Sequence, residues 1–156
     1  MKIIMMGVAG AGKSTIGMML ARELGWAFFD GDDFHSEANR EKMARGAALT
    51  DEDRAEWLAR LRTILKGNDR CVLACSALKE AYRQILAVDE QVRFVYLKGT
   101  YKQIRVRLEK RAGHYMPVQL LKSQFDTLEE PAEALVIDIA LTPEEIIPII
   151  RKGLNL

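Results

Sequence analysis

Residues 7–14 read Gly-Val-Ala-Gly-Ala-Gly-Lys-Ser, and this segment constrains the fold of the chain more than any other. A short apolar run, Ile3 to Met6, precedes it, and residues 13–24 have helical spacing that stops at Gly25. The segment matches G-x-x-x-x-G-K-[ST] at every fixed position, in the context that this pattern requires. The sequence therefore predicts a buried strand, a glycine-rich loop and a helix, in that order.

This loop is predicted to bind the phosphates of a nucleoside triphosphate. Glycines let several backbone N–H groups point at one anion, and the following helix adds its positive N-terminal end. Lys13 is expected to reach the β- and γ-phosphates, and Ser14 to ligate Mg²⁺. The alternative, a flexible turn with a chance lysine, is disfavoured by the flanking strand and helix. The predicted nucleotide-binding residues are Gly7, Gly10, Ala11, Gly12, Lys13, Ser14 and Thr15.

Apolar runs and helical spacing alternate along the rest of the chain. Further strands are expected at residues 26–29, 71–75, 92–97 and 134–139, and helices at 36–45, 51–66, 77–87, 101–111 and 117–128. A last helix is expected to start at Thr142-Pro143 and to kink at Pro148. This alternation predicts a parallel α/β sheet in one domain over residues 1–156.

Composition excludes several classes of function. The 23 Lys and Arg residues balance 22 Asp and Glu residues, and a net charge of +1 argues against a general nucleic-acid binder. No apolar stretch approaches the about 20 residues that a membrane span needs, so no membrane partner is expected. Cys71 and Cys75 can form neither a disulfide framework nor a zinc site. We therefore expect a cytoplasmic protein.

Two carboxylates, Asp30 and Asp32, follow the second expected strand. Ligands of parallel sheets bind beyond the carboxyl ends of the strands, so these acids are expected to face the phosphate loop. One can orient Mg²⁺ through its waters, and the other can accept the proton of an attacking hydroxyl. The alternative is an acidic turn in which Asp30 or Asp33 caps the next helix.

Characteristic residues follow in a fixed order from residue 3 to about residue 139. Beyond the loop they are Asp30-Gly31-Asp32, His35, Asn39, Lys42-Met43, Gly46, Asp53-Arg54, Trp57, Cys75-Ser76-Ala77-Leu78-Lys79, Tyr82-Arg83, Tyr96-Leu97-Lys98-Gly99, Arg107-Leu108, Arg111, Gly113-His114, Met116-Pro117, Ser123-Gln124-Phe125, Thr127-Leu128-Glu129 and Pro131. In this pattern the sequence resembles the gluconate kinases of the thermoresistant type.

The resemblance implies a fold, a reaction and an assembly. The fold is the P-loop nucleoside-triphosphate hydrolase fold of the nucleoside-monophosphate kinases, with five parallel strands in the order 2-3-1-4-5, flanking helices and a lid. Acceptor-binding helices are expected at about residues 35–66 and the lid at about 107–118. The implied reaction transfers phosphate from ATP, with Mg²⁺, to D-gluconate, giving 6-phospho-D-gluconate. Family members are often dimers, so a homodimer is expected by resemblance.

A sugar-acid acceptor needs a cation for its carboxylate and polar groups for its hydroxyls. Arg54 suits the carboxylate because its planar guanidinium can bind with two hydrogen bonds; Lys79 and His35 follow in preference. The candidate substrate-binding residues are Asp32, His35, Asn39, Arg54, Lys79, Arg83, His114 and Gln124. For each basic residue the alternative is a solvated surface charge, and for Gln124 an exposed helical position.

Arg107 and Arg111 share one face of an expected helix, and together they could offset charge over the phosphates. The alternative is an ordinary charged helix edge. With Lys13 and with Asp32 as proton acceptor, these arginines complete the predicted catalytic set, while Ser14 and Asp30 are the predicted metal ligands.

Other functions remain open at this point. The same loop and carboxylates would serve a related P-loop kinase for shikimate, a nucleotide or another sugar acid. A nucleotide-binding regulatory switch is a third class, but the third expected strand ends in Cys75-Ser76 and not in a metal-binding Asp. The turn at residues 140–142 is a candidate site for the nucleotide base.

Overall fold

The computed structural model describes residues 1–111 and 117–156, and a parallel sheet forms its centre. Five strands pair in the predicted order β2-β3-β1-β4-β5. Their bounds are β1 (Lys2–Met6), β2 (Ala27–Asp30), β3 (Cys71–Ala74), β4 (Val92–Lys98) and β5 (Leu135–Asp138). Strand β1 lies in the middle with all five residues buried, which explains its nearly continuous apolar sequence.

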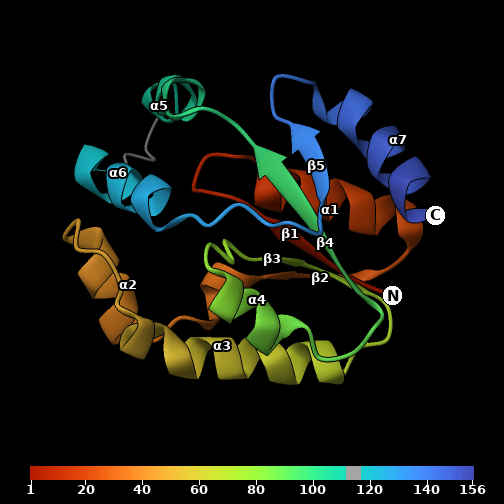
Figure 1. Cartoon of the computed structure of the whole chain (residues 1–156), viewed down its shortest axis with the longest axis horizontal. Helices are drawn as coiled ribbons and strands as arrows, with labels where there is room; N and C mark the ends of the chain where they lie inside the picture. The colour runs from red at the N-terminus through yellow and green to blue at the C-terminus, as the bar shows by residue number, and fades with distance from the viewer. Residues whose placement is uncertain (112–116) are drawn as a thin grey trace.

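Helices cover both faces of this sheet (Figure 1). Their bounds are α1 (Lys13–Leu24), the 3₁₀ turn η1 (Gly31–Phe34), α2 (Glu37–Ala44), α3 (Asp51–Lys66), α4 (Glu80–Leu86), α5 (Tyr101–Glu109), α6 (Val118–Thr127) and α7 (Pro143–Leu154). Helices α1 and α7 lie on one face, and α3 and α4 lie on the other. None of the helices in the described ranges has the length and apolar character that a bilayer span needs.

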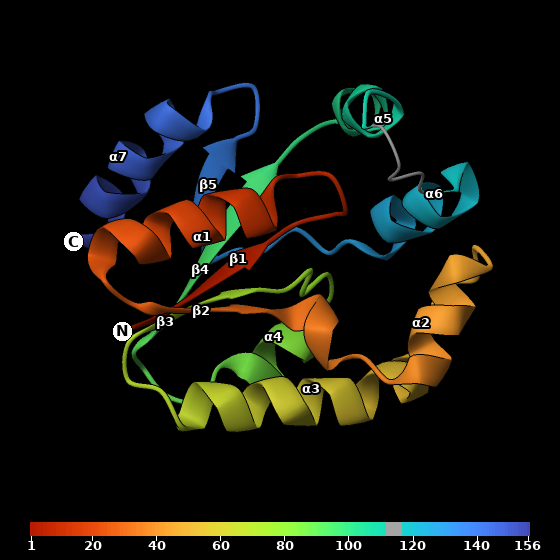
Figure 2. The same ribbon diagram turned by 180° about the vertical axis from the view of Figure 1, so that it is seen from behind.

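Side chains of β1 alternate between two hydrophobic cores. Ile3 and Met5 join the core beneath α1 and α7, whereas Ile4 and Met6 join the core above α3. Each such buried side chain contributes about 1.5–3 kcal/mol to folding. Helices α2, α5 and α6 gather at one end of the sheet, opposite the two termini (Figure 2). The sheet therefore holds the loops at this end on a rigid base.

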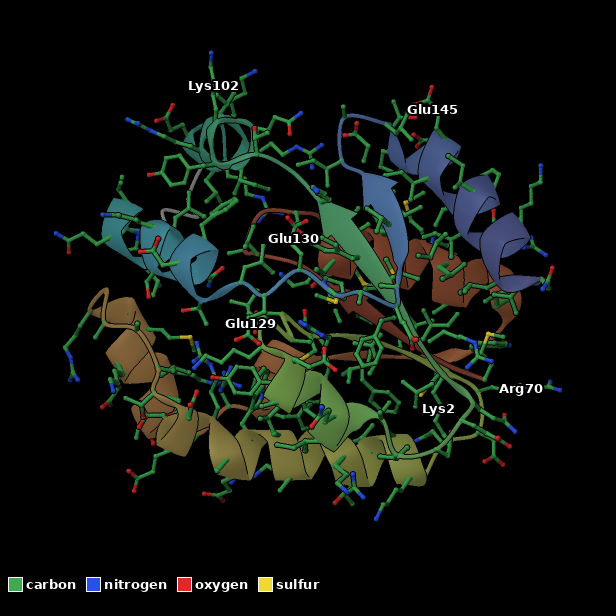
Figure 3. The ribbon with its side chains drawn as sticks, viewed as in Figure 1. Lys2, Arg70, Lys102, Glu129, Glu130 and Glu145 are labelled. Carbon is green, nitrogen blue, oxygen red and sulfur yellow. The ribbon has the colours of Figure 1, made fainter. Side chains whose placement is uncertain are left out.

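Several helix bounds differ from the sequence-based expectations. Helix α5 ends at Glu109 and not at residue 111, so Arg111 lies beyond the helix whose face it was expected to share with Arg107. Helix α4 begins at Glu80 and not at residue 77, because Ala77 has a left-handed φ of 46° that turns the chain first. The Glu129 carboxylate, which lies beside the start of α4 (Figure 3), accepts from the Glu80 N–H at 2.8 Å. The turn η1 matches the alternative of an acidic turn after the second strand, because the Asp30 side chain caps it by accepting from the Asp32 N–H.

Candidate active site

The phosphate loop connects β1 to α1 in the left-handed backbone that its glycines permit. Gly10 and Gly12 have φ values of 81° and 97°, which residues with a Cβ rarely adopt. A Cβ at Gly7 would lie 2.8 Å from a carbonyl oxygen of β4. The Lys13 ammonium donates to the Val8 carbonyl at 2.9 Å, across the loop. Because no described side chain caps α1, its first N–H groups are available to an anion.

A cleft of about 410 Å³ extends from this loop toward α2 and α3. Most of the described residues predicted for the site line it. They are Gly10, Gly12, Lys13, Ser14, Thr15, Asp30, Asp32, His35, Arg54, Arg111 and Gln124. The cleft opens at the carboxyl ends of β2 and β3, where a parallel sheet binds its ligands.

The two predicted carboxylates follow β2 and differ in their surroundings. Asp30 accepts from the Ser14 hydroxyl at 2.8 Å and from the Asp32 N–H at 3.0 Å. Burial raises the pKa of Asp32, although nearby Lys13 opposes the rise. Burial also lowers the pKa of Lys13, which the Asp32 charge opposes. A carboxyl with a raised pKa is a better proton acceptor than one with the ordinary value.

Ser14 and Asp30 also fit a hard cation. Within the described residues, no group of three or more His, Cys, Asp or Glu side chains could hold a metal by itself. One hydroxyl and one carboxylate suit Mg²⁺, which keeps several waters and takes further oxygens from substrate phosphates. The donor set therefore fits Mg²⁺ bound together with a nucleotide.

The acceptor side of the cleft is built around Trp57, near the start of α3. Its indole N–H donates to the Gly31 carbonyl at 2.7 Å, which fixes the turn that presents Asp32. The His35 ring stacks on Trp57, with ring centroids 4.1 Å apart and planes 14° apart. Arg54 lies one turn earlier in α3, and its Nη1 donates to the Leu49 carbonyl at 2.7 Å.

His35 is a buried and neutral imidazole. Burial lowers its pKa to about 4, with help from the positive charges of Arg54 and Arg40. Its Nδ1 atom is buried and has no hydrogen-bond partner among the described residues. Because buried polar atoms are normally paired, this atom suggests that a ligand hydroxyl completes the site.

Three predicted acceptor residues do not line the cleft. The Asn39 amide donates to the Asp53 carbonyl at 2.8 Å and so links α2 to α3. The Lys79 ammonium pairs with Asp51 at 2.9 Å. The Arg83 guanidinium, 4% exposed, donates to backbone carbonyls of residues 77 and 129. These side chains bind the protein itself in this structure, and their predicted role in acceptor binding stays a prediction.

The two remaining acceptor predictions have different outcomes. Gln124, on α6, lines the cleft, and its side-chain oxygen accepts from the Ala9 N–H of the phosphate loop at 2.7 Å. His114 lies outside the described residues, as does part of the lid expected at 107–118.

A second cavity, of about 320 Å³, borders the other side of the phosphate loop. Arg107 and Arg111 line it together with apolar residues at the start of α7 and in the turn before it, including Pro143 and Leu141. Arg107 donates to the Ile139 carbonyl. Arg111 borders both cavities, so it lies between the candidate base site at residues 140–142 and the main cleft.

Met43 and Leu49 line the cleft but were not among the predicted site residues. Both lie within residues 35–66, the segment predicted to hold the acceptor. For Met43 the family pattern, which includes Lys42-Met43, is a second sequence signal, whereas Leu49 has no signal beyond its place in that segment.

The parallel sheet of order 2-3-1-4-5, with its phosphate loop and adjoining acceptor cleft, defines a P-loop kinase. The family model described as shikimate kinase matches residues 9–143. Closer relatives make the assignment finer: the chain belongs to the gluconokinase family. This confirms the family predicted from the sequence.

Three comparisons illustrate the relationship. The gluconokinase of Arabidopsis thaliana is 46% identical, over 93% of this chain and 87% of that protein. The thermoresistant gluconokinase of Escherichia coli (strain K12) is 40% identical, over 96% and 93% of the two chains. The crystal structure of a gluconokinase from Sinorhizobium meliloti 1021 matches with a TM-score of 0.92 and 38% identity, over 99% and 91%.

Proposed function

We propose that the protein transfers the γ-phosphoryl group of ATP to the 6-hydroxyl of D-gluconate, giving ADP and 6-phospho-D-gluconate. One observation supports this most directly: a single cleft joins the phosphate loop to a carboxylate, Asp32, and to a guanidinium, Arg54. An anionic polyol needs these groups at its two ends. The relatives named gluconokinase, 36–47% identical, support the choice of acceptor.

The nucleotide occupies the loop and the second cavity. Backbone N–H groups of residues 10–15 and the Lys13 ammonium bind the phosphates, and the apolar turn at residues 139–143 contacts the base. Ser14 and Asp30 hold Mg²⁺, which when bound neutralises charge on the phosphates.

The acceptor occupies the main cleft with its carboxylate on Arg54. His35 and Gln124 bind hydroxyls along the chain, and the neutral imidazole suits this because it can accept or donate one hydrogen bond. Asp32 accepts the proton of the attacking hydroxyl, while Lys13, Arg107 and Arg111 offset the charge that develops on the phosphoryl group.

Shikimate is the second candidate acceptor, because the matching family model bears that description. Its carboxylate could also bind Arg54. Solved shikimate kinases, such as that of Aquifex aeolicus, are only 18% identical to this chain and share the fold alone. A homodimer, expected by resemblance, and a cytoplasmic location, expected from composition, stay proposals.

A coupled assay of ADP release over D-gluconate, shikimate, other sugar acids and nucleoside monophosphates tests the proposal. We expect D-gluconate to have the highest kcat/KM, and ³¹P NMR of the product to show a phosphomonoester on the primary hydroxyl. A higher kcat/KM for shikimate or a nucleotide would overturn the choice of acceptor. ADP release that no small molecule stimulates would instead favour a regulatory switch.

A further inference from the structure

Among the described residues, Arg54 is held by the protein through one terminal nitrogen. Its Nη1 donates to the Leu49 carbonyl at 2.7 Å and to the Tyr82 hydroxyl at 3.1 Å. Within the described part of the chain, its Nε and Nη2 atoms donate no hydrogen bond. These two atoms form the edge of the guanidinium that binds a carboxylate through two parallel N–H groups. The recognition edge of Arg54 is thus left for a ligand.

A chain of contacts behind Arg54 fixes its other edge. Tyr82, on α4 and only 5% exposed, donates its hydroxyl to the Asp51 carboxylate. Asp51 also accepts from the Lys79 ammonium at 2.9 Å. Neither Asp51 nor Tyr82 nor Lys79 lines the cleft. These hydrogen bonds connect Asp51, at the exposed start of α3, through Tyr82 of α4 to Arg54 on the cleft wall.

The pKa shifts of Tyr82 and Asp51 keep Tyr82 as the donor and Asp51 as the acceptor of their hydrogen bond. Burial and the Asp51 contact raise the pKa of Tyr82, so its hydroxyl keeps its proton. Hydrogen bonds from Tyr82 and Lys79 lower the pKa of Asp51, so its carboxylate stays ionised. The Arg54 guanidinium carbon also lies 5.4 Å from the centre of the Tyr82 ring, which favours a cation above it.

A free arginine side chain loses much rotamer freedom when it binds a ligand. Held in place beforehand, its guanidinium loses less, and affinity for the carboxylate rises. We infer that Tyr82, oriented by Asp51, is a positioning residue that presets Arg54 and thereby sets the preference for a sugar acid over the corresponding neutral polyol. This inference rests on the proposed function, in which Arg54 binds the acceptor carboxylate.

The variant Tyr82→Phe removes the hydroxyl and keeps the ring. We expect the KM for D-gluconate to rise about tenfold, the order expected when a hydrogen bond to a charged group is lost. The kcat and the KM for ATP should change less than twofold. In the background of Arg54→Lys, which keeps the charge but not the planar fork, Tyr82→Phe should change kcat/KM less than twofold.

Tyr96→Phe is the matched control. Tyr96 is also buried, its hydroxyl contacts the Glu130 carboxylate, and it lies away from the cleft. This variant should keep the wild-type KM for D-gluconate. Should Tyr82→Phe fail to fold, as judged by circular dichroism, Asp51→Asn at the exposed start of α3 should raise the same KM about threefold.

If Tyr82→Phe lowers kcat/KM by the same factor in the wild-type and Arg54→Lys backgrounds, the inference is overturned. A fall in kcat with an unchanged KM for D-gluconate would overturn it as well. The wild-type rate with D-gluconate tests the proposed function separately. A wild type that does not phosphorylate D-gluconate contradicts that function. If the wild type is active and the Tyr82 variant keeps the wild-type KM for D-gluconate, only the positioning role is contradicted.

Discussion

Asp32 and Lys13 line the same cleft, where Lys13 is half-buried and Asp32 is exposed. Burial raises the pKa of the acid and lowers the pKa of the amine, while each charge opposes the shift of the other. The raised pKa makes the Asp32 carboxylate a better acceptor of an alcohol proton than a carboxylate with the ordinary value.

Replacing Asp32 by Asn removes the proton acceptor and keeps the shape of the side chain. We expect kcat with D-gluconate to fall by about 10²–10⁴-fold, the range for loss of a general base. The Kd for ATP, measured by calorimetric titration, should stay within about threefold, since the loop is intact. Near-normal kcat in this variant would remove Asp32 from the catalytic role.

His35 predicts a pH dependence of stability. Its pKa is about 4 in the folded protein and about 6.5 in the unfolded chain. The unfolded state therefore binds more protons between these values, and the stabilisation present above pH 6.5 is lost as the pH falls toward 4.

Urea unfolding at pH 7 and pH 5 measures this effect against His35→Gln. From pH 7 to pH 5 the wild type should lose about 1–2 kcal/mol more unfolding free energy than the variant. Parallel losses in the two proteins would show that the imidazole is not held neutral.

At the scale of elements, the start of α3 organises the acceptor side. A capping box between Thr50 and Asp53 fixes the first turn, and Asp53 also pairs with Lys42 of α2 at 2.6 Å. One and two turns into the helix come Arg54 and Trp57, which face the cleft. The positions of Arg54 and Trp57 in the cleft therefore depend on the stability of the first turns of α3.

Trp57→Phe tests the link between α3 and η1. The variant removes the indole hydrogen bond to the buried Gly31 carbonyl, so unfolding free energy should fall by about 0.5–1.5 kcal/mol. The kcat should fall because the turn bearing Asp32 loosens. Urea unfolding and steady-state kinetics measure the two effects. Trp26→Phe, outside both cavities, is the control and should keep wild-type kcat; equal kcat in both variants would contradict the link.

The features that could be predicted from the sequence are those set by local patterns of residues. Residues 7–14 predicted the loop and its flanking elements because the pattern is complete within eight positions. It could not show that Lys79 finds Asp51, 28 residues earlier in the chain, or that Arg83 is buried on backbone carbonyls. A lone cation in a sequence looks the same whether its partner is a ligand or the protein. Contacts between helices decide this, and they require the folded chain.

At the scale of the whole molecule, the two cavities meet at the phosphate loop. Gly10, Gly12, Thr15 and Arg111 border both of them. A nucleotide that fills one cavity therefore brings its terminal phosphate toward the other. Both cavities lie at the end of the sheet where the strands finish, and the two cores hold this end rigid.

Nucleotide binding should stabilise the whole fold by linkage. With Mg²⁺ and a non-hydrolysable ATP analogue at 100 times its Kd, we expect a gain of about 2.7 kcal/mol and a rise in Tm of about 5–10 °C. At the same concentration Lys13→Ala should show less than half of this rise. Lys66→Ala, an exposed residue at the end of α3, should behave like the wild type. Full stabilisation of Lys13→Ala would contradict the role of the loop lysine.

The most direct measurement is a crystal structure with Mg²⁺, a non-hydrolysable ATP analogue and D-gluconate bound together. We predict the 6-hydroxyl about 3–3.5 Å from the γ-phosphorus, within hydrogen-bond reach of Asp32, and the carboxylate on the free edge of Arg54. D-gluconate bound outside the main cleft, or bound with its carboxylate toward the phosphate loop, would contradict the account.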